Sequence, residues 1–350
     1  MAFIQMYYYL FSFKKLVNYN YNRSLSRKEA VSVIIAARNE KENLAAYLPL
    51  ILNQNHENFE VIVVNNFSTD GSFECLTSFS HKRLKLIDHK GKKGKKAALQ
   101  VGIEAAKYGL LLFTDADCKV NSEDWISLMS SGFETNTEFV LGFGAFLKSD
   151  TLLNKVIRFE GLLNAIQYFS FTLKGSPYMG VGRNLAYRKS TFIKAKGFDQ
   201  HQNVLSGDDD LIVNQMATAK NVNIVIDQKS HMTSEAETNW LSFYRQKRRQ
   251  LSAGVYYKPQ DRLKLAVFGA SNFLYYLLLV SLLLSSPHTL FIFGIFVLKQ
   301  FCEYLVVGKL CQRLENIDLV IWLLIIEPIY LIVITIAGVS TWFRKVDRWK

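Results

Sequence analysis

Four short apolar segments, each followed by polar residues, limit the folds open to this chain more than any other feature. They cover residues 31–37, 59–64, 84–87 and 110–113, and most of their residues are Val, Ile, Leu or Phe. Strands of a parallel sheet are continuously apolar in this way because helices cover both faces of the sheet. Stretches with helical spacing separate the segments, at 41–53, 71–80 and 96–108. The alternation predicts an α/β fold with a mostly parallel sheet and right-handed crossovers.

Polar clusters follow three of these predicted strands. They are Asn39-Glu40, Asn65-Asn66 and Asp115-Ala116-Asp117. Ligands of open parallel sheets bind beyond the carboxyl ends of the strands, so we expect the functional site at this edge. A further strand is expected at 138–147, before a long helix at 151–173.

The chain changes character at about Leu263, where three long apolar stretches begin. They cover 263–284, 290–307 and 319–343. The first is long enough to cross a bilayer alone, which takes about 20 residues. Lys299, Glu303 and Glu327 interrupt the other two, and ionisable groups at that depth should face partner helices or a polar cavity. The expected organisation is an apolar or interfacial segment at 1–30, an α/β domain at 31–237, an amphipathic interfacial helix at 238–262 and a transmembrane region at 263–350.

Basic residues set the expected orientation. Arg245, Lys247, Arg248 and Arg249 lie just before the first apolar stretch, among aromatic residues, as is typical of a helix in the membrane interface. By the positive-inside rule the α/β domain is then cytoplasmic, in a multi-pass protein of the cell inner membrane. Three full crossings would place the basic C-terminus outside, against that rule. A re-entrant stretch, or a crossing by the N-terminal segment, is the alternative.

The chain carries 42 Lys and Arg against 30 Asp and Glu, a formal net charge of +12. Such a charge suits anionic lipid, a phosphorylated substrate or nucleic acid. The basic residues flank apolar stretches and no nucleic-acid module is recognisable, so nucleic acid is not an expected partner. The four cysteines lie far apart without a C-x-x-C pair, which gives no indication of a zinc cluster or a disulfide framework.

Asp115 and Asp117 follow a buried strand and lie two positions apart, so in extended backbone their carboxylates share one side. Two anions this close need a cation. Mg²⁺ or Mn²⁺ held by carboxylates keeps coordination positions for substrate phosphates. The alternative is that Asp115 only caps a helix that begins near Asn121.

Two further segments carry charges that a helix start alone does not explain. The loop Gly91-Lys92-Lys93-Gly94-Lys95-Lys96 precedes a predicted helix, where lysines fit the helix dipole poorly unless an anion such as a diphosphate lies there. A solvated basic loop or a lipid-facing patch is the alternative. Gly207-Asp208-Asp209-Asp210 precedes the helical run 211–219. Acidic residues stabilise a helix's first turn, but three in a row after a glycine indicate a general base near a bound acceptor.

Six motifs in this order resemble the family 2 glycosyltransferases. They are Val33-Ile34-Ile35 with Arg38-Asn39-Glu40, the segment from Val63 to Gly71, the segment from Gly94 to Gln100, Thr114-Asp115-Ala116-Asp117-Cys118, Gly207-Asp208-Asp209 and Gln246-Lys247-Arg248-Arg249. The resemblance covers Val31 to about Lys258. It implies a Rossmann-like GT-A catalytic domain, a nucleotide-diphosphate sugar donor, with a UDP-sugar expected, Mg²⁺ or Mn²⁺, and inversion at the anomeric carbon. The apolar tail also resembles membrane-anchored members, including relatives of the hyaluronan and cellulose synthases.

The resemblance also implies roles for single residues. Those matched to the donor are Ala37, Asn39 and Glu40 at the nucleotide, Asn66 at the base in place of the usual Asp, Lys95 on the phosphate side, and Asp115 near the ribose and phosphates. Asp117 matches the metal ligand. Asp209 matches the catalytic base, and a shift of the alignment by one residue would choose Asp208.

The motif Gln246-x-x-Arg249 matches the start of a Q-x-x-R-W signature that is also assigned to the donor side, but Gln250 replaces its Trp. That Trp helps to hold the growing chain in processive synthases, so its absence favours transfer of a single sugar. The acceptor, a lipid-linked or other saccharide, is expected at Tyr178, Gly182, Arg183 and Asn184. The alternative functions are a nucleotidyltransferase and a non-catalytic membrane protein that binds an anionic ligand.

Overall fold

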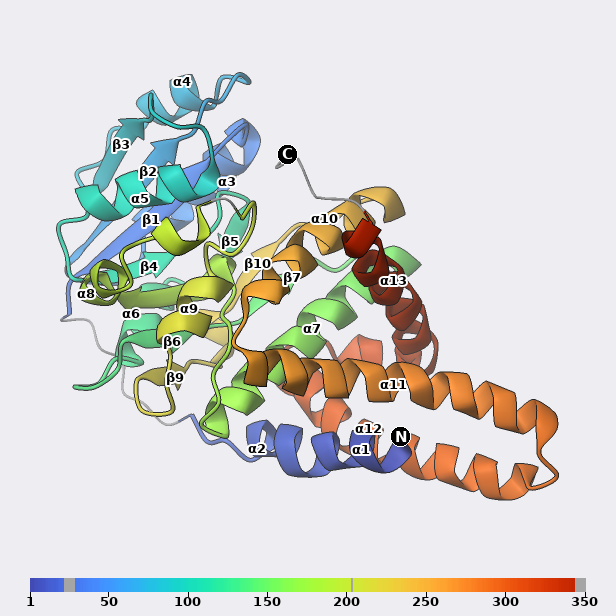
Figure 1. Ribbon diagram of the computed structural model, residues 1–350. Helices are drawn as coiled ribbons and strands as arrows, with labels where there is room; N and C mark the ends of the chain where they lie inside the picture. Colours follow the sequence, from blue (N-terminus) through green and yellow to red (C-terminus); the bar gives the residue numbers. More distant parts are fainter. Residues whose placement is uncertain (22–28, 203, 344–350) are drawn as a thin grey trace. The chain divides into compact units, whose positions relative to one another are not determined.

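The computed structural model describes residues 1–21, 29–202 and 204–343 (Figure 1). The chain forms two compact units. Of the described residues, the helical unit comprises Met1–Asn20, Lys148–Lys174 and residues 237–343, and the sheet unit comprises Tyr21–Leu147 and Gly175–Ala236. Residues 148–174, expected within the domain at 31–237, thus group with the helical unit. The basic C-terminal residues Arg344, Lys345, Arg348 and Lys350 lie outside the described residues.

The sheet unit contains two sheets. Its strands are β1 (Val31–Ala37), β2 (Phe59–Asn65), β3 (Leu84–Asp88), β4 (Leu110–Phe113), β5 (Cys118–Val120), β6 (Phe139–Leu141), β7 (Gly144–Phe146), β8 (Leu185–Arg188), β9 (Val222–Ile224) and β10 (Met232–Ser234). The larger sheet has the order β3-β2-β1-β4-β8-β6-β9, and the smaller has the order β5-β10-β7. Strands β1 to β4 pair in parallel, and β8 is antiparallel to both of its neighbours. The expected mostly parallel sheet is confirmed.

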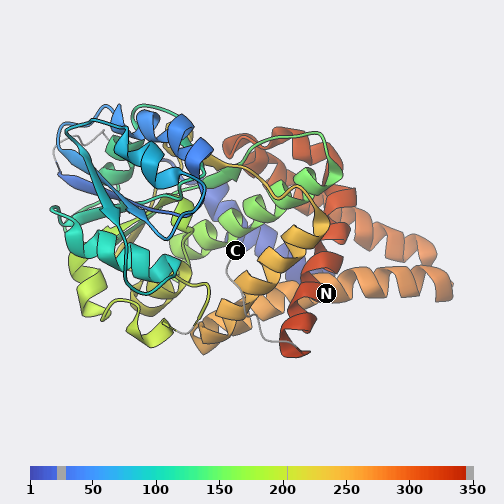
Figure 2. The same cartoon turned by 90° about the horizontal axis from the view of Figure 1, so that it is seen from above.

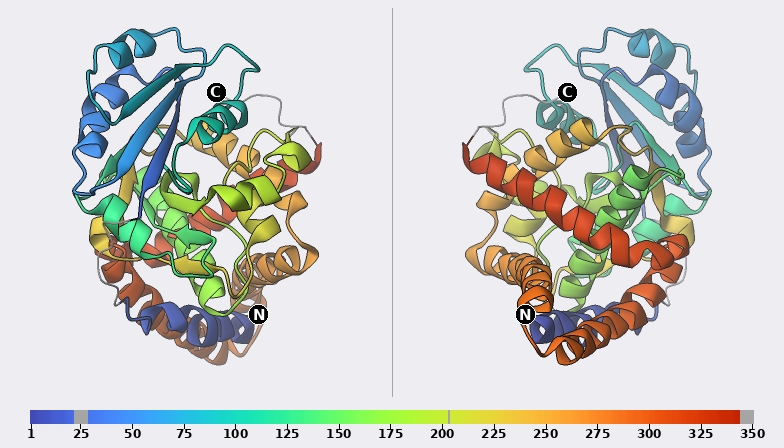
Figure 3. Two further views of the ribbon diagram at one scale, coloured as in Figure 1. Left: turned by 90° about the vertical axis from the view of Figure 1, so that its left-hand side faces the viewer. Right: turned by 90° about the vertical axis from the view of Figure 1, so that its right-hand side faces the viewer.

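Helices cover both faces of the larger sheet, as Figure 3 shows from the side. They are α3 (Lys41–Leu52), α4 (Ser72–Thr77), α5 (Lys95–Ala105), α6 (Trp125–Ser131), α8 (Lys189–Lys194) and α9 (Asp210–Met216), with the 3-10 helices η2 (Gly182–Asn184), η3 (Asp199–His201) and η4 (Gln228–Ser230). Val33 of β1 packs in one core with Leu44 of α3, while Ile34 faces α5. A Cβ at Gly102 of α5 would lie 2.8 Å from Cγ2 of Ile34, so glycine lets this helix lie close to the sheet.

The expected single strand at 138–147 is wrong. The segment forms β6 and β7, which belong to different sheets. Gly142 lies between them, and its N–H donates to the carbonyl of Asn184 at 2.9 Å. A Cβ at Gly142 would lie only 2.4 Å from Nδ2 of Asn184, so only glycine allows this close approach. The chain leaves one sheet and enters the other at this position.

The described elements of the helical unit are all helices, and they come from three separate stretches of the chain. They are α1 (Ala2–Tyr7), the π-helix η1 (Tyr8–Phe13), α2 (Lys14–Val17), α7 (Leu152–Leu173), α10 (Trp240–Ala253), the 3-10 helix η5 (Gly254–Tyr256), α11 (Pro259–Ser285), α12 (Thr289–Arg313), the 3-10 helix η6 (Ile317–Trp322) and α13 (Leu323–Phe343). Within the part of the chain that the structure describes, three segments are long and apolar enough to cross a membrane, at Pro259–Ser285, Thr289–Arg313 and Ile317–Thr341. Figure 2 shows α11 and α12 as neighbouring long helices joined at one end by a short turn.

The N-terminal helix packs against α11. Gln5 donates to the carbonyl of Phe268 at 2.9 Å and to the hydroxyl of Ser271 at 2.6 Å. The hydroxyl of Tyr8 donates to the carbonyl of Lys264 at 2.9 Å. The N-terminal segment is thus built into the helical unit by its polar side chains as well as by its apolar ones.

Lys299, Glu303 and Glu327, which interrupt the second and third apolar stretches, lie in one buried cluster. The ammonium of Lys299 lies 2.6 Å from Glu303 and 3.1 Å from Glu327. The side-chain amide of Asn272 on α11 donates to Glu327 at 3.0 Å. These groups face partner helices, as the sequence predicts, because an isolated charge there would cost several kcal/mol.

Candidate active site

The loops after β1 and β2 are bonded to each other at the carboxyl edge of the sheet. The N–H of Asn39 donates to the hydroxyl of Ser68 at 3.0 Å, and its side-chain oxygen accepts from the N–H of Thr69 at 2.8 Å. The N–H of Glu40 donates to the hydroxyl of Ser72 at 2.9 Å. Ala37 is buried, and its carbonyl accepts the N–H of Asn66 at 2.8 Å. The bonds of these predicted donor residues fix the shape of the two loops.

Asn66 at the end of β2 has a buried donor to spare. Its side-chain oxygen accepts the N–H of Gly94 at 3.3 Å, which fixes the orientation of the amide. Its side-chain nitrogen has no hydrogen-bond partner among the described residues, although Asn66 is only 1% exposed. An unpaired buried N–H is costly, so a ligand that brings an acceptor would be favoured here.

Lys95, in the first turn of α5, bridges two of the predicted acidic residues. Its ammonium lies 2.8 Å from Asp115 and 3.0 Å from Asp208. Burial acts to lower the pKa of Lys95, but Asp115, Asp208 and Asp209 outweigh it and hold the pKa well above the ordinary value. The end of β4, the start of α5 and the segment before α9 therefore meet at one charge cluster.

Asp209 caps α9 and is held by main-chain donors. Its carboxylate accepts the N–H of Gly182 at 2.5 Å and the N–H of Asp210 at 2.8 Å. A Cβ at Gly182 would lie 3.1 Å from the same oxygen of Asp209, so glycine permits the short contact. Burial, reinforced by the charge of Asp208, raises the pKa of Asp209 to about 6.

The pKa values of the adjacent carboxylates Asp208 and Asp209 are shifted in opposite directions. Burial acts to raise the pKa of Asp208, but the ammonium of Lys95 offsets this and brings the pKa below its ordinary value. Asp209 instead accepts main-chain N–H groups, and burial together with the charge of Asp208 raises its pKa. Two carboxyl groups whose pKa values are pushed apart are typical of an acid–base site.

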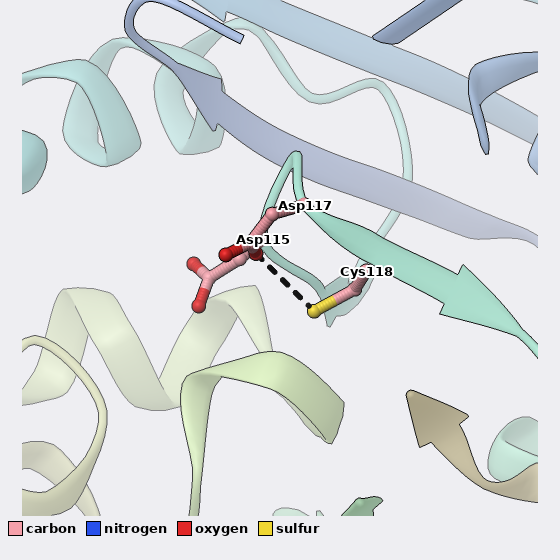
Figure 4. A group of neighbouring side chains, drawn as sticks. All are labelled: Asp115, Asp117 and Cys118. Atoms are coloured by element: carbon pink, nitrogen blue, oxygen red, sulfur yellow. Dashed lines mark hydrogen bonds between the residues drawn. The ribbon is translucent and has the colours of Figure 1, made fainter. Parts of the chain in front are cut away.

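Asp115, Asp117 and Cys118 form a group that fits a divalent cation (Figure 4). One ligand atom from each lies within 4.8 Å of the others. The carboxylate oxygens suit Mg²⁺ or Mn²⁺. The thiol of Cys118 donates to Asp117 at 3.6 Å, and burial raises its pKa well above the ordinary value, which keeps it protonated. Sequence reasoning missed Cys118, although it directly follows the acidic pair.

The alternative role of Asp115 as a helix cap is wrong. Residues Cys118–Val120 form β5, and the next helix, α6, begins at Trp125 with Asp124 at its N-cap position. The acidic pair thus lies in a turn between two strands.

Two of the four predicted acceptor residues are inaccessible. Tyr178 is 2% exposed, so its ring offers no surface for a sugar. Asn184 is fully buried and accepts from Trp125 at 3.0 Å while donating to the carbonyls of Phe143 and Ser230. Both side chains contribute to the packing of the sheet unit, and their contact with an acceptor remains a prediction.

Unlike Tyr178 and Asn184, Gly182 and Arg183 are only partly buried. Gly182 contacts Asp209 through its main chain, as described above. The guanidinium of Arg183 lies 4.0 Å from the ring centroid of Phe146 and donates to the hydroxyl of Ser234 at 2.8 Å. Their contact with an acceptor remains a prediction.

Gln246 and Arg249 lie on α10 of the helical unit, whereas the other predicted donor residues belong to the sheet unit. Lys247 between them is buried, and its ammonium pairs with Glu160 of α7 at 2.8 Å. The assignment of Gln246 and Arg249 to the donor remains a prediction.

An open, mostly parallel sheet with acidic residues at the carboxyl edge, followed by a smaller mixed sheet, defines a GT-A glycosyltransferase fold. The mannosyltransferase PcManGT from Pyrobaculum calidifontis, solved with GDP-Man and Mn²⁺, has this fold and matches with a TM-score of 0.61 at 14% identity, over 97% of this chain and 95% of its own. Residues 32–195 match the family described as Glycosyl transferase family 2, and the chain is similar to that family over this range.

Curated relatives agree with this family. The chain is 35% identical to the glycosyltransferase AglE of Haloferax volcanii over 100 residues, which is 27% of this chain and 33% of that protein. It is 27% identical to the poly-beta-1,6-N-acetyl-D-glucosamine synthase of Staphylococcus epidermidis over 158 residues, which is 42% of this chain and 38% of that protein. The chain thus spans about a third of the length of these relatives.

Proposed function

We propose that the protein is an inverting, divalent-metal-dependent glycosyltransferase that takes its sugar from a nucleotide-diphosphate sugar, with a UDP-sugar as the expected donor. The acceptor is a hydroxyl of a lipid-linked or other saccharide, and one sugar is transferred per event. The protein acts as a multi-pass protein of the cell inner membrane with its sheet unit in the cytoplasm. The solved mannosyltransferase with GDP-Man supports a nucleotide-diphosphate sugar as the donor.

The observation that carries the proposal is the charge cluster around Lys95. One ammonium joins Asp115, beside the candidate metal ligand Asp117, to Asp208, beside the candidate base Asp209. A group that stabilises a leaving diphosphate and a group that removes a proton must both lie near the reacting carbon. The cluster supports this arrangement within the sheet unit alone.

In the proposed reaction, Asp209 removes the proton from the acceptor hydroxyl while that oxygen forms its bond to the anomeric carbon. The bond between this carbon and the diphosphate oxygen breaks, and its electron pair leaves with the nucleoside diphosphate. Attack from the face opposite the leaving group inverts the configuration. Lys95 stabilises the charge that the diphosphate gains, and the unpaired amide N–H of Asn66 is available to an acceptor atom of the nucleobase.

Asp117 is the candidate metal ligand, with Asp115 and Cys118 beside it. When bound, a Mg²⁺ or Mn²⁺ ion would neutralise the leaving diphosphate. The protonated thiol of Cys118 orients the carboxylate of Asp117 by its hydrogen bond.

The membrane part of the proposal rests on the helical unit. Three candidate spans, and an N-terminal helix bonded to the first of them, favour an acceptor presented at the bilayer. The exposed Trp240 and Leu241 on the basic helix α10 support its position in the interface. Gln250, where processive relatives have Trp, favours single transfer.

The test incubates the full chain, purified and reconstituted into lipid membranes, with each member of a panel of nucleotide sugars. Mn²⁺ or Mg²⁺ is present, and each reaction is run with and without lipid extract. We expect nucleoside diphosphate to be released from one donor, faster with lipid extract, and a product of inverted anomeric configuration. Release of nucleoside monophosphate with pyrophosphate would instead identify a nucleotidyltransferase. Failure to bind or turn over any nucleotide sugar would contradict the proposal.

A further inference from the structure

Lys96, the residue after Lys95, contacts a different part of the sheet unit. Its ammonium donates to the carbonyl of His201 at 2.7 Å and to the carbonyl of Val204 at 2.9 Å. Both acceptors belong to the irregular segment that leads into Gly207 and Asp208. Consecutive lysines in the first turn of α5 thus bind the same acidic segment at two places, one through its main chain and one through a carboxylate.

The backbone between His201 and Asp208 has little regular structure of its own, so the hydrogen bonds from Lys96 help to fix it. The 3-10 helix η3 ends at His201, and residues 204–209 lie outside every described strand and helix, so no regular backbone hydrogen bonding fixes the carbonyl of Val204. Gly207 then takes a φ of 86°, a left-handed conformation that turns the chain into the acidic triplet. Displacement of Val204 would therefore move Asp208 and Asp209, which follow within five residues.

The chemistry of Lys96 differs from that of a surface lysine. Its ammonium is partly buried, and burial lowers its pKa although Asp208, Asp210 and Asp209 act to raise it. A charged donor bound to two neutral carbonyls gives stronger hydrogen bonds than neutral donors give. The main chain ahead of the candidate base is held by one side chain of α5.

We propose that Lys96 is a positioning residue for the general base Asp209. It fixes the main chain of the acidic segment relative to α5, so that the helix that places Lys95 at the donor phosphates also places the base at the acceptor. This inference rests on the proposed glycosyltransferase reaction. The role differs from that of Lys95, because Lys96 acts through the segment that carries Asp209 and touches no reacting atom.

Lys189 provides a matched control. Its ammonium also donates to two main-chain carbonyls, those of Glu104 at 3.2 Å and Ala106 at 2.9 Å, at the other end of the same helix. Removing it deletes a similar pair of bonds without touching the acidic segment. Any general loss of stability from deleting such bonds should appear in both variants.

The experiment compares Lys96→Met, Lys96→Arg and Lys189→Met in the purified full chain. Turnover is followed with the donor found active for the wild type, donor binding by titration, and amide hydrogen exchange of the peptide 204–210 by mass spectrometry. We expect Lys96→Met to lower kcat by about 10- to 100-fold, the loss that a displacement of about 1 Å in a catalytic group causes. Donor affinity should change less than about threefold, and exchange in 204–210 should rise.

Lys96→Arg keeps a charged donor and should recover most of the turnover, whereas Lys189→Met should leave kcat and the exchange of 204–210 at wild-type values. Equal kcat in Lys96→Met and Lys189→Met, or unchanged exchange in Lys96→Met, would overturn the inference. Lys96→Gln, which keeps a shorter neutral donor, replaces Lys96→Met if the latter does not fold. A wild type without any transfer would instead refute the proposed function, and the exchange measurement would still decide the role of Lys96.

Discussion

At the scale of single residues, neighbouring carboxylates acquire different properties from their surroundings. Asp208 faces the ammonium of Lys95, whereas Asp209 accepts only main-chain N–H groups in the hydrogen bonds described here. Lys95 keeps Asp208 ionised. Burial, together with the negative charge of Asp208, makes ionisation of Asp209 harder. A group with a pKa of about 6 can take up a proton and lose it again near neutral pH.

Asp209→Asn should lower kcat by at least about 100-fold, the usual contribution of a general base, while the donor still binds. In the wild type, kcat should rise with pH through about 6 as Asp209 ionises. The measurement is the pH profile of nucleoside diphosphate release together with a donor-binding titration. Normal transfer by Asp209→Asn, or a profile without an acidic limb near 6, would contradict the assignment.

The same pKa predicts the stability of this variant. Because the folded pKa of Asp209 lies above that of an unfolded chain, its contribution to stability is full below the unfolded value and is lost as the pH rises through about 6. Asp209→Asn cannot ionise, so its melting temperature relative to wild type should increase between pH 5 and pH 8. A constant difference over this range would show that Asp209 titrates elsewhere.

Asp117→Ala should bind Mn²⁺ and Mg²⁺ more weakly than the wild type does. Chelation of metal should abolish turnover of the wild type, and adding either ion should restore it, because the acidic pair and the leaving diphosphate both need a cation. Metal affinity, measured by titration with Mn²⁺ in the absence of donor, should fall at least about tenfold in Asp117→Ala. Asp227→Ala, a change in an acidic residue of the same unit outside this cluster, is the control. Full activity without any divalent ion would refute the role of Asp117.

At the scale of elements, the sequence predicts a strand well when neighbouring residues in the chain define it, and poorly when a contact with a distant residue does. β1 and β4 match the expected ranges because a continuously apolar run between polar residues has no other good conformation in a layered fold. β6 and β7 are three residues each, and what separates them is a contact of Gly142 with Asn184, 42 residues away in the chain. No local pattern reports such a contact.

The candidate site shows the same limit. The acidic residues and Lys95 were found from their spacing and flanking glycines, and the structure brings Lys95 together with Asp115 and Asp208. Tyr178 and Asn184 were chosen by position in a motif, and their burial depends on packing that the sequence does not display. The same holds for Lys96, whose partners are main-chain carbonyls of ordinary residues.

Gly142→Ala tests the point where the chain changes sheets. The added methyl group would lie 2.4 Å from Nδ2 and 2.5 Å from Cγ of Asn184, whose side chain is fixed by three hydrogen bonds. We expect the free energy of unfolding to fall by about 1–3 kcal/mol, as overpacking usually causes. Chemical denaturation measures it, with Gly109→Ala as the control, since a Cβ there meets no atom within 4 Å. Equal stability of the two variants would contradict the crowding at Gly142.

At the scale of the whole molecule, the helical unit holds charges within its apolar helices. Lys299 carries one positive charge between Glu303 and Glu327, and all three are almost fully buried. Breaking a buried ion pair leaves an uncompensated charge, which costs more than the pair contributes when intact. The cluster therefore joins α12 to α13 most strongly when all three residues are present.

Lys299→Met should destabilise the protein by about 3–5 kcal/mol, because the two carboxylates lose their ammonium. The double variant Lys299→Met with Glu327→Gln should recover part of this loss. Lys309→Met, an exposed lysine on the same helix, should have little effect. Thermal unfolding of the purified protein in detergent measures the differences. A Lys299→Met variant as stable as Lys309→Met would show that the cluster does not support the bundle.

The order of the two units along the chain has a further consequence. The backbone passes between them at residues 20–21, 147–148, 174–175 and 236–237, so neither unit is one continuous stretch of sequence. During synthesis the ribosome releases α7 before its partners α10 and α13 have been made. Glu160 of α7 can therefore form its ion pair with Lys247 only after α10 has been synthesised. A gene exchange that replaces the sheet unit alone would need several matched breakpoints. Inheritance should therefore keep the two units together, and one cut in the chain cannot separate the sheet unit from the helical unit.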